Sequence, residues 1–377
     1  MSPQAAPTPA APAAPPRRKS RYLLWIGALL AAAAALVVFW WQSRVLPIHA
    51  VEVRPLVSES GPSWLAGAIT EEIVGALRPA VQPSAEASFT AVLEGSVARS
   101  GDRVRVTARL SRLDGHRYWT RTFDRPITEI SAELAAAIVP ASRRKPARHK
   151  LSAKAYELFL EARQRFASNV EQAIAGFDRA TETDPEFGRA WAWLSMATES
   201  LVEQGGGRPN ELLPGARDAA ERAVTLNPEL ADTHLALGIV RLQYDWDWQA
   251  AQRELDRALE IDPASPLAIE WRQRWLEAMD RAPVPPLSLA AAPRDPEAAR
   301  RYLADAEDLR SHAYVPPAAF VLAANLAHDS ESLFHWLDVA YEERSVHLPY
   351  LLRSPALPQA DPRLQDLIRR LRLPTKP

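Results

Sequence analysis

A group of four residues that recurs three times with the same spacing constrains the fold of this chain more than any other feature. Each copy has three small or apolar residues and a proline, at steps of +4, +3 and +5: Ala173, Phe177, Ala180 and Pro185; Ala216, Ala220, Ala223 and Pro228; Ala251, Leu255, Ala258 and Pro263. The first two steps place three residues on one helix face, and the proline lies just past the helix end. A helix that recurs with its own stop signal predicts a stacked helical array, and such arrays usually bind other macromolecules.

Further positions recur around these prolines. Trp191 and Leu194 lie six and nine residues after the first proline. His234 and Leu237 lie at the same distances after the second, and Gly238 follows where the close packing of two helices needs a small residue. This pattern resembles the tetratricopeptide repeat, whose unit is about 34 residues long. The resemblance implies a solenoid of paired helices that binds a protein partner.

We assign residues 151–280 to this array. The proline spacings of 43 and 35 residues exceed the repeat unit by nine and one, and we expect the nine extra residues in a loop at 205–210 that projects from the array. Tyr244–Trp248 is expected to form the turn of the third repeat, with rings that seal adjacent repeats rather than form a ligand cage. A fourth repeat begins at Leu267 and stops at a Pro-rich stretch. Residues 296–377 predict a degenerate repeat pair and a C-terminal capping helix.

An apolar run of 20 residues without charge, 22–41, is long enough to cross a bilayer as a helix. Basic residues directly precede it, so the positive-inside rule places residues 1–21, a disordered Pro/Ala-rich tail, in the cytoplasm. These basic residues are Arg17, Arg18, Lys19 and Arg21. We therefore expect a single-pass protein of the bacterial inner membrane whose chain is periplasmic from about Ser43 onward. The alternative is a cleaved signal peptide, and the bulky residues Phe39–Trp41 at the expected cleavage position disfavour it.

Residues 48–140 show the pattern of a small α/β domain. A strand at 48–56 precedes a helix at 62–77, and three further strands with two tight turns predict an antiparallel meander. One stripe of the helix is apolar, and Glu71 and Glu72 face away from it as solvated charges. One strand has a basic face, for which a solvated surface is favoured over an anion or nucleic-acid patch. The basic residues are Arg103, Arg105, Arg109 and Arg112.

Three segments of this domain, 64–72, 91–110 and 118–125, resemble the TolB-like amino-terminal domain that precedes tetratricopeptide repeats in bacterial signalling proteins. In that family the domain is not catalytic, and it is joined to output modules such as the DNA-binding heads of CadC-type regulators and nucleotide cyclases. We expect no such module here. The stretch between Leu77 and Phe89 is shorter than in the family, which implies a truncated sheet. The expected fold class is α+β: one transmembrane helix, a small α/β TolB-like domain and an all-α tetratricopeptide solenoid.

The sequence shows no motif for catalysis or for cofactor binding. It lacks a phosphate-binding Gly-rich loop, a His-x-x-x-His spacing and a Gly-x-Ser-x-Gly elbow. It has no cysteine, and its net charge of −1 gives no support for nucleic-acid binding. We therefore expect no catalytic residue, cofactor or metal. The prediction is a non-enzymatic, membrane-anchored adapter or scaffold that binds a protein partner through its array on the periplasmic side. The alternative is a sensor of a signalling system, derived from CadC-type regulators without the DNA-binding head.

Overall fold

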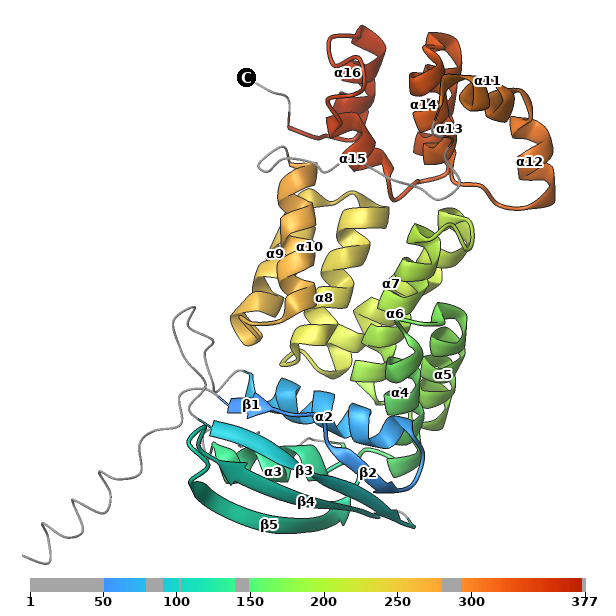
Figure 1. Ribbon diagram of the computed structural model, residues 1–377. Helices are drawn as coiled ribbons and strands as arrows, with labels where there is room; N and C mark the ends of the chain where they lie inside the picture. Colours follow the sequence, from blue (N-terminus) through green and yellow to red (C-terminus); the bar gives the residue numbers. More distant parts are fainter. Residues whose placement is uncertain are drawn as a thin grey trace, which may run out of the picture. The chain divides into compact units, whose positions relative to one another are not determined.

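A computed structural model describes residues 51–78, 91–101, 103–139, 149–279, 293 and 295–374 (Figure 1). The expected cytoplasmic tail, 1–21, and the expected membrane helix, 22–41, lie outside these residues. Within the described ranges, no helix is both long and apolar enough to span a membrane.

A five-stranded sheet forms the first part of the described chain. Its strands are β1 (Val51–Val53), β2 (Val57–Ser60), β3 (Ala91–Ser100), β4 (Arg103–Ser111) and β5 (Arg117–Pro126). β1 and β2 both pair in parallel with β3. Of the strand expected at 48–56, the described residues form only the short β1, and β2 directly after that range was not expected. β3, β4 and β5 form the antiparallel meander that the sequence predicts.

Two helices, α2 (Trp64–Leu77) and α3 (Ile130–Ile138), pack against each other and against one face of the sheet (Figure 1). Alternate residues of β4 are buried beneath them, while the arginines between these residues face solvent. The apolar stripe of α2 completes this core, with every member at most 4% exposed: Leu65, Ile69, Ile73 and Leu77. Burying one such side chain contributes roughly 1.5–3 kcal/mol, so this stripe fixes α2 on the sheet.

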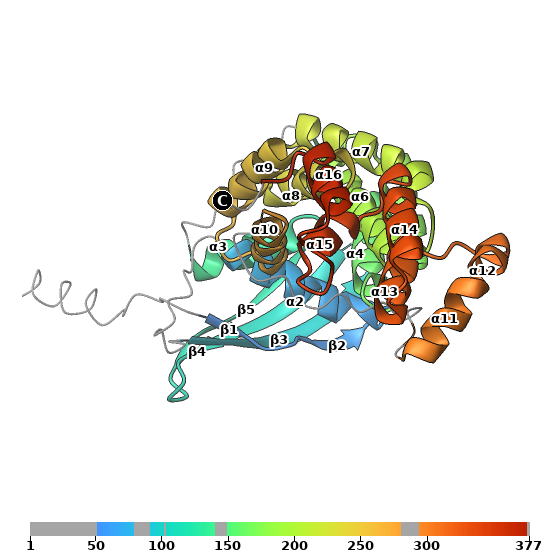
Figure 2. The same ribbon diagram turned by 90° about the horizontal axis from the view of Figure 1, so that it is seen from above.

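The helical array follows the sheet. Its helices are α4 (Ala153–Arg165), α5 (Val170–Thr183), α6 (Gly188–Glu203), α7 (Pro209–Leu226), α8 (Ala231–Val240), the π-helical turn η2 (Arg241–Asp245), α9 (Trp248–Ile261) and α10 (Pro266–Ala278). α4 packs on α5, α6 on α7, and α8 on α9. Seen from above, α7 and α9 lie on the outside of a curve and α6, α8 and α10 on its inside (Figure 2). Side-chain caps on α4, α5, α9 and α10 each contribute about 1 kcal/mol; the capping residues are Ser152, Asn169, Asp247 and Ser265.

The second repeat takes up its extra residues in a way that differs from our expectation. α6 and α7 have 16 and 18 residues, whereas α4 and α5 have 13 and 14. The connecting loop is short because α7 already begins at Pro209, inside the loop expected at 205–210. This loop does not project freely: a Cβ built on Gly205 would lie 3.1 Å from Cγ of Pro316. Most of the insertion therefore lengthens the helix pair.

The C-terminal region continues with helices. They are α11 (Pro296–Ala304), α12 (Ala306–His312), α13 (Pro317–Ala327), α14 (Ser330–Glu342), α15 (Leu348–Arg353) and α16 (Pro362–Arg370). α13 packs on α14, as expected for a degenerate repeat pair, and α16 forms where the closing helix was expected. α15 packs on α10, and Val346 just before it joins an apolar cluster with residues of α6 and α7. The C-terminal region thus contacts the inner helices of the array.

Candidate functional site

The recurring tetrads form the core between the paired helices. Their nine small or apolar members lie on α5, α7 and α9 and are at most 3% exposed: Ala173, Phe177, Ala180, Ala216, Ala220, Ala223, Ala251, Leu255 and Ala258. The three prolines of the tetrads, Pro185, Pro228 and Pro263, lie just past the ends of these helices and are not buried. The tetrads therefore define the repeat architecture, and a binding surface has to be sought on the opposite, inner side of the array.

The other recurring positions fall into two groups. Leu237 and Gly238 are buried, and a Cβ on Gly238 would lie 2.9 Å from the side chain of Leu255. The prediction that this glycine permits close helix packing is thus confirmed. Leu194 and Trp191 are only half-buried. The indole N–H of Trp191 donates to the carbonyl of Pro185 at 3.1 Å, so this ring closes the turn that precedes α6.

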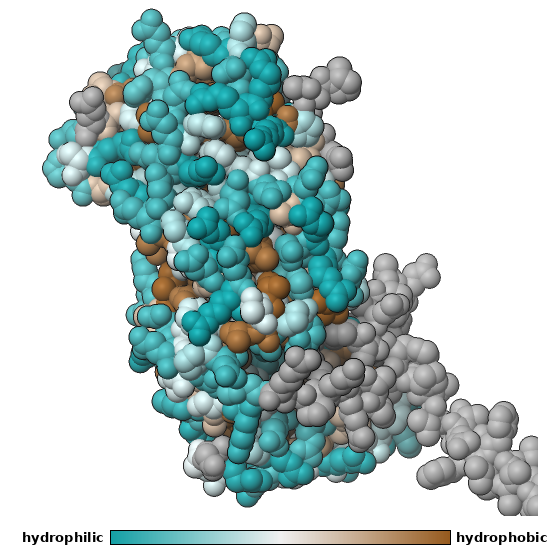
Figure 3. Space-filling model, turned by 180° about the vertical axis from the view of Figure 1, so that it is seen from behind, coloured by the Kyte–Doolittle hydropathy of each residue, from teal (hydrophilic) through white to brown (hydrophobic). Residues whose placement is uncertain are grey.

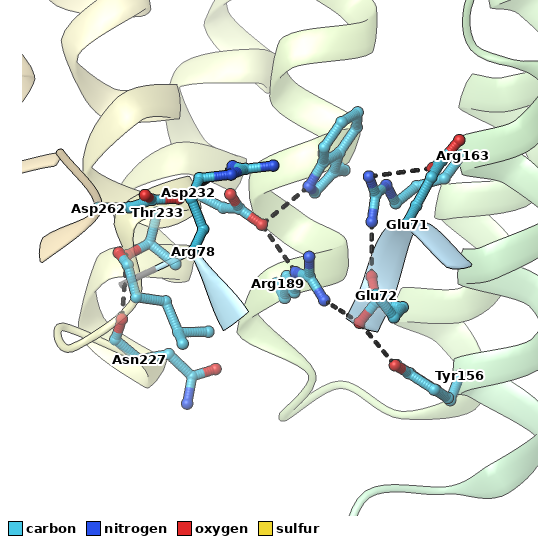
Figure 4. A network of polar contacts seen from close by, with 12 residues as sticks. Glu71, Glu72, Arg78, Tyr156, Arg163, Arg189, Asn227, Asp232, Thr233 and Asp262 are labelled. Carbon is cyan, nitrogen blue, oxygen red and sulfur yellow. Dashed lines mark hydrogen bonds and ion pairs between the residues drawn. The ribbon is translucent and has the colours of Figure 1, made fainter. Parts of the chain in front are cut away.

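A buried carboxylate from α2 lies among cationic and phenolic groups of the array (Figure 4). Arg163 of α4 donates to Oε1 of Glu72 at 2.6 Å, and Arg189 of α6 donates to Oε2 at 2.7 Å. The hydroxyl of Tyr156 also donates to Oε2, at 2.7 Å. Glu72 is only 8% exposed. We call Tyr156, Arg163 and Arg189 the acidic socket, because together they bind this acidic side chain.

The sequence-based interpretation of Glu72 as a solvated charge was therefore wrong. Its neighbour Glu71 remains half-exposed and pairs with Arg163 at 3.3 Å. The donors that bury Glu72 follow it by 84 to 117 residues in the chain, so no local pattern reveals them. One signal was available: Gly67, Ala68 and Gly75 lie on the same side of α2, and small residues allow a second packed face.

The socket is extended by a second carboxylate and by aromatic rings. Nε of Arg189 donates to Oδ2 of Asp232 at 2.7 Å, and the indole of Trp193 donates to the same oxygen at 3.1 Å. The guanidinium of Arg163 lies over the Trp193 ring, 4.6 Å from its centroid. Trp193 also packs against Phe177 of the first tetrad. The sequence analysis singled out Trp191 and overlooked Trp193, which links the socket to the core.

Burial and charge oppose each other in the socket. Burial would raise the pKa of Glu72, but Arg189 and Arg163 outweigh it and hold the pKa below its ordinary value. Asp232 behaves alike: burial acts to raise its pKa, and Arg189 lowers it to about 2. Burial, followed by the charge of Glu72, raises the pKa of Tyr156 well above its usual value. The socket at neutral pH therefore holds an ionised carboxylate with charged and neutral hydrogen-bond donors.

A second polar cluster lies further along the inner helices. Glu199 on α6 is 2% exposed, and among the described residues neither of its carboxylate oxygens has a hydrogen-bond partner. Burial, and then the charges of Glu203 and Asp245, raise its pKa to about 8. Glu203 itself pairs with Arg274 of α10. This ion pair joins the inner helices of the second and fourth repeats.

The aromatic turn of the third repeat reaches beyond the adjacent repeats. Trp246 adopts the left-handed backbone region, with φ of 54°, and its ring packs on Tyr341 of α14 at 5.5 Å between centroids. The indole of Trp248 donates to the carbonyl of Leu371 at 2.8 Å. The bond from the Trp275 indole to the carbonyl of Trp248 joins neighbouring repeats. The turn therefore contacts the neighbouring repeat, as expected, and in addition attaches the C-terminal region to the array.

The outer face of the sheet carries the predicted basic strand. Three of its four arginines lie close to carboxylates: Arg103 and Arg105 to Asp124, at 2.6 and 3.2 Å, and Arg112 to Asp114, at 3.4 Å. A shallow recess of about 430 Å³ next to Arg109 is lined by residues of both charges. This mixture of charges agrees with the solvated face that the sequence analysis favoured.

The exposed surface and the chemistry of the side chains add two further observations. The face seen in Figure 3 is mainly hydrophilic, with small hydrophobic groups between polar residues. Within the described ranges, three large hydrophobic residues are strongly exposed, namely Val57, Leu113 and, on α10, Ile269. Within the same ranges, no group of three or more His, Cys, Asp or Glu residues is suited to hold a metal ion.

The helix pairs and their buried tetrads form a stacked array of helical repeats. No protein-family profile matches the chain. Over 174 residues the chain is 29% identical to a curated protein of Rhizobium meliloti (strain 1021) described as putative adenylate cyclase 3; the match covers 41% of this chain and 30% of that protein. The chain thus spans less than a third of this relative's length.

Solved structures of tetratricopeptide proteins superpose on parts of the chain. The TPR domain of Sgt2 from Aspergillus fumigatus has 17% identity and a TM-score of 0.29, over 38% of this chain and 93% of that domain. A thermophilic TPR protein of Thermus thermophilus has 14% identity and a TM-score of 0.28, over 58% of this chain and 98% of that protein.

Proposed function

We propose that this protein is a non-enzymatic adapter that binds a protein partner through its tetratricopeptide array. The main support for the proposal is that the two helices of each repeat differ in which side chains they bury. The tetrads of α5, α7 and α9 build the core, and half-buried or exposed polar and charged side chains lie on the inner helices α4, α6 and α10. Solenoids of stacked repeats use such inner surfaces for partners.

The sheet region has a structural role in the proposed adapter. We assign it to the TolB-like amino-terminal domain on the resemblance of 64–72, 91–110 and 118–125. The order of β1, α2 and β3 followed by a meander supports the assignment. In the adapter this domain is a structural companion of the array, because its helix α2 supplies Glu72 to the acidic socket.

We further propose that residues 22–41 anchor the protein in the bacterial inner membrane, with the array in the periplasm. The support is the uncharged run of 20 residues and the basic residues before it. Reporters fused after Pro377 test the orientation. A periplasm-only reporter should be active and a cytoplasm-only reporter inactive; the reverse result would refute the periplasmic assignment.

A sensor that has lost its DNA-binding head is the second candidate. It is favoured by the resemblance to CadC-type proteins and would have to act through the cytoplasmic tail. Deleting residues 1–16 separates the candidates. A sensor would lose its cellular output, whereas an adapter would keep its partner and its function.

The adapter function is tested by recovering a partner with the tagged full chain, solubilised from membranes in detergent. Ile269 on α10 is 51% exposed, and Leu113 in the β4–β5 hairpin is 58% exposed. Ile269→Glu and Leu113→Glu therefore introduce the same charge at two exposed aliphatic positions, one in the array and one outside it. We expect a defined protein to co-purify with the wild type and with Leu113→Glu, and to be reduced at least fivefold with Ile269→Glu. Failure to recover any protein, or loss only with Leu113→Glu, would contradict the proposal.

A further inference from the structure

Helix α2 contacts both the sheet and helix α4 of the array. Its apolar stripe belongs to the sheet, and its other face carries small and charged residues: Gly67, Ala68, Glu71, Glu72, Gly75 and Arg78. The side chain of Gln164 on α4 reaches α2, and a Cβ on Gly67 would lie 3.0 Å from its Oε1. At the far end, Arg78 donates to Asp262, in the turn before α10, at 3.0 Å. α2 therefore extends along the array from α4 to that turn.

Within this contact, Glu72 occupies the acidic socket as a ligand would. The three donors come from two different repeats, and the helix pairing of those repeats rests on the tetrads instead. The socket also has an unused hydrogen-bond donor: Nε of Arg163 is buried and, among the described residues, has no acceptor. A guanidinium offers five N–H donors in a planar fork suited to carboxylates. An acidic side chain on a helix is thus the chemistry that this surface recognises.

The polar contacts between the sheet region and the array are ion pairs and hydrogen bonds. Besides those of Glu71 and Glu72, they include the pair of Arg78 with Asp262 and that of Arg99 on β3 with Glu157 on α4. A buried ion pair adds little net stability, because the cost of removing both charges from water offsets their attraction. Polar interfaces between parts of one chain resemble those of transient complexes. Opening this contact to water therefore restores hydration to both sides.

We propose that the acidic socket is a recognition site for an acidic helix of a partner protein, and that α2 occupies it as an internal competitor. This proposal rests on the adapter function and specifies the class of partner segment. A partner helix with two adjacent acidic residues displaces α2, and the sheet region then separates from the array. The contact thereby keeps the array closed until such a helix is present.

The test uses the full chain in detergent and a labelled synthetic peptide with the sequence of residues 62–78. A control peptide carries Glu71→Gln and Glu72→Gln and keeps the same apolar stripe. Two variants open the contact at different points. Glu72→Arg places a third guanidinium in the socket, and Arg78→Glu opposes Asp262 without altering the socket.

Opening is measured independently of binding. The chain has no cysteine, so Leu113→Cys on the exposed hairpin and Glu182→Cys on α5 give two unique sites for a donor and an acceptor dye. Transfer efficiency should fall in both opening variants while the far-ultraviolet circular dichroism stays that of the wild type. A folded variant pair with unchanged transfer efficiency would show a permanent contact and would overturn the proposal.

Binding is measured by fluorescence anisotropy. We expect both opened variants to bind the acidic peptide at least tenfold more tightly than the wild type does, and at least tenfold more tightly than they bind the control peptide. Adding Arg189→Glu to the Arg78→Glu variant should abolish the preference for the acidic peptide. Opened variants that bind neither peptide, or both equally, would overturn the proposal. Because the probe is the chain's own sequence, this failure is independent of whether the full chain recovers a partner.

Discussion

The buried carboxyl of Glu199 makes the stability of the array depend on pH in a way that one substitution removes. Glu199→Gln replaces a carboxyl that burial holds protonated by an amide of nearly the same size and shape. The folded pKa is about 8, against an ordinary value of 4.5. The stabilising contribution of this group is therefore complete below pH 4.5 and is lost as the pH rises toward 8.

The magnitude follows from that shift. For each pH unit above 4.5, the free energy of unfolding of the wild type falls by about 1.36 kcal/mol, until the carboxyl of the folded protein itself ionises. At pH 7.5 the cost is at most about 4 kcal/mol, and nearly all of it applies because Glu199 is only 2% exposed. We expect Glu199→Gln to be more stable than the wild type by about 2–4 kcal/mol at pH 7.5 and equal to it within about 1 kcal/mol at pH 5.

Urea unfolding of the full chain in detergent, followed by tryptophan fluorescence at pH 5, 6.5, 7.5 and 8.5, provides the assay. Glu182→Gln on the exposed side of α5 is the matched control, since it makes the same substitution without burial. The control should follow the wild-type curve at every pH. A wild type and a Glu199→Gln variant whose free energies of unfolding run parallel between pH 5 and 8 would refute the reasoning.

Three further predictions concern packing, pH and the C-terminal region. Gly238→Ala forces a methyl group against the buried side chain of Leu255 and should lower the free energy of unfolding by about 1–2 kcal/mol. At Gly215, nothing lies within 4 Å of an added Cβ, so Gly215→Ala should be neutral or stabilise the protein by about 0.5–1 kcal/mol. Urea unfolding measures both changes. The hydrogen bond to Asp184 raises the pKa of His149, so His149 should stabilise the fold at low pH and lose this effect as the pH rises through its folded pKa. His149→Gln should therefore lower the melting temperature at pH 5 more than at pH 8.5. An equal loss at both pH values would count against this ion pair. Trp248→Phe leaves the carbonyl of Leu371 without its indole donor and should cost about 1–3 kcal/mol, with faster proteolysis of α16 as the readout; unchanged proteolysis would show that α16 is held by other contacts.

The sequence predicted the repeat architecture because that architecture depends on local spacing. The tetrads fix which residues of α5, α7 and α9 are buried, and alternation fixes the register of β4 with its neighbours. The extra residues between Pro185 and Pro228 were placed less well. Spacing reveals how many residues a repeat gains, but it does not distinguish a longer loop from two longer helices.

The candidate site could not be predicted from the sequence for a different reason. Glu72 and Arg189 lie 117 residues apart and meet only because the sheet region packs against the array. On α2 alone, an acidic pair opposite an apolar stripe is the usual pattern of a solvated surface. Glu199 was overlooked for the same reason, because its burial depends on residues of distant helices. Long-range packing, which no periodicity records, decides which charges become part of a site.

Photo-cross-linking in living cells tests directly whether the array binds a protein partner. A photoreactive amino acid replaces Gln273, on the inner helix α10, or Thr120, exposed on β5 of the sheet. We expect a discrete adduct of higher mass from position 273 and none from position 120. An adduct from position 120 alone, or none from position 273 and from the exposed residues Lys154 on α4 and Glu270 on α10, would contradict this expectation.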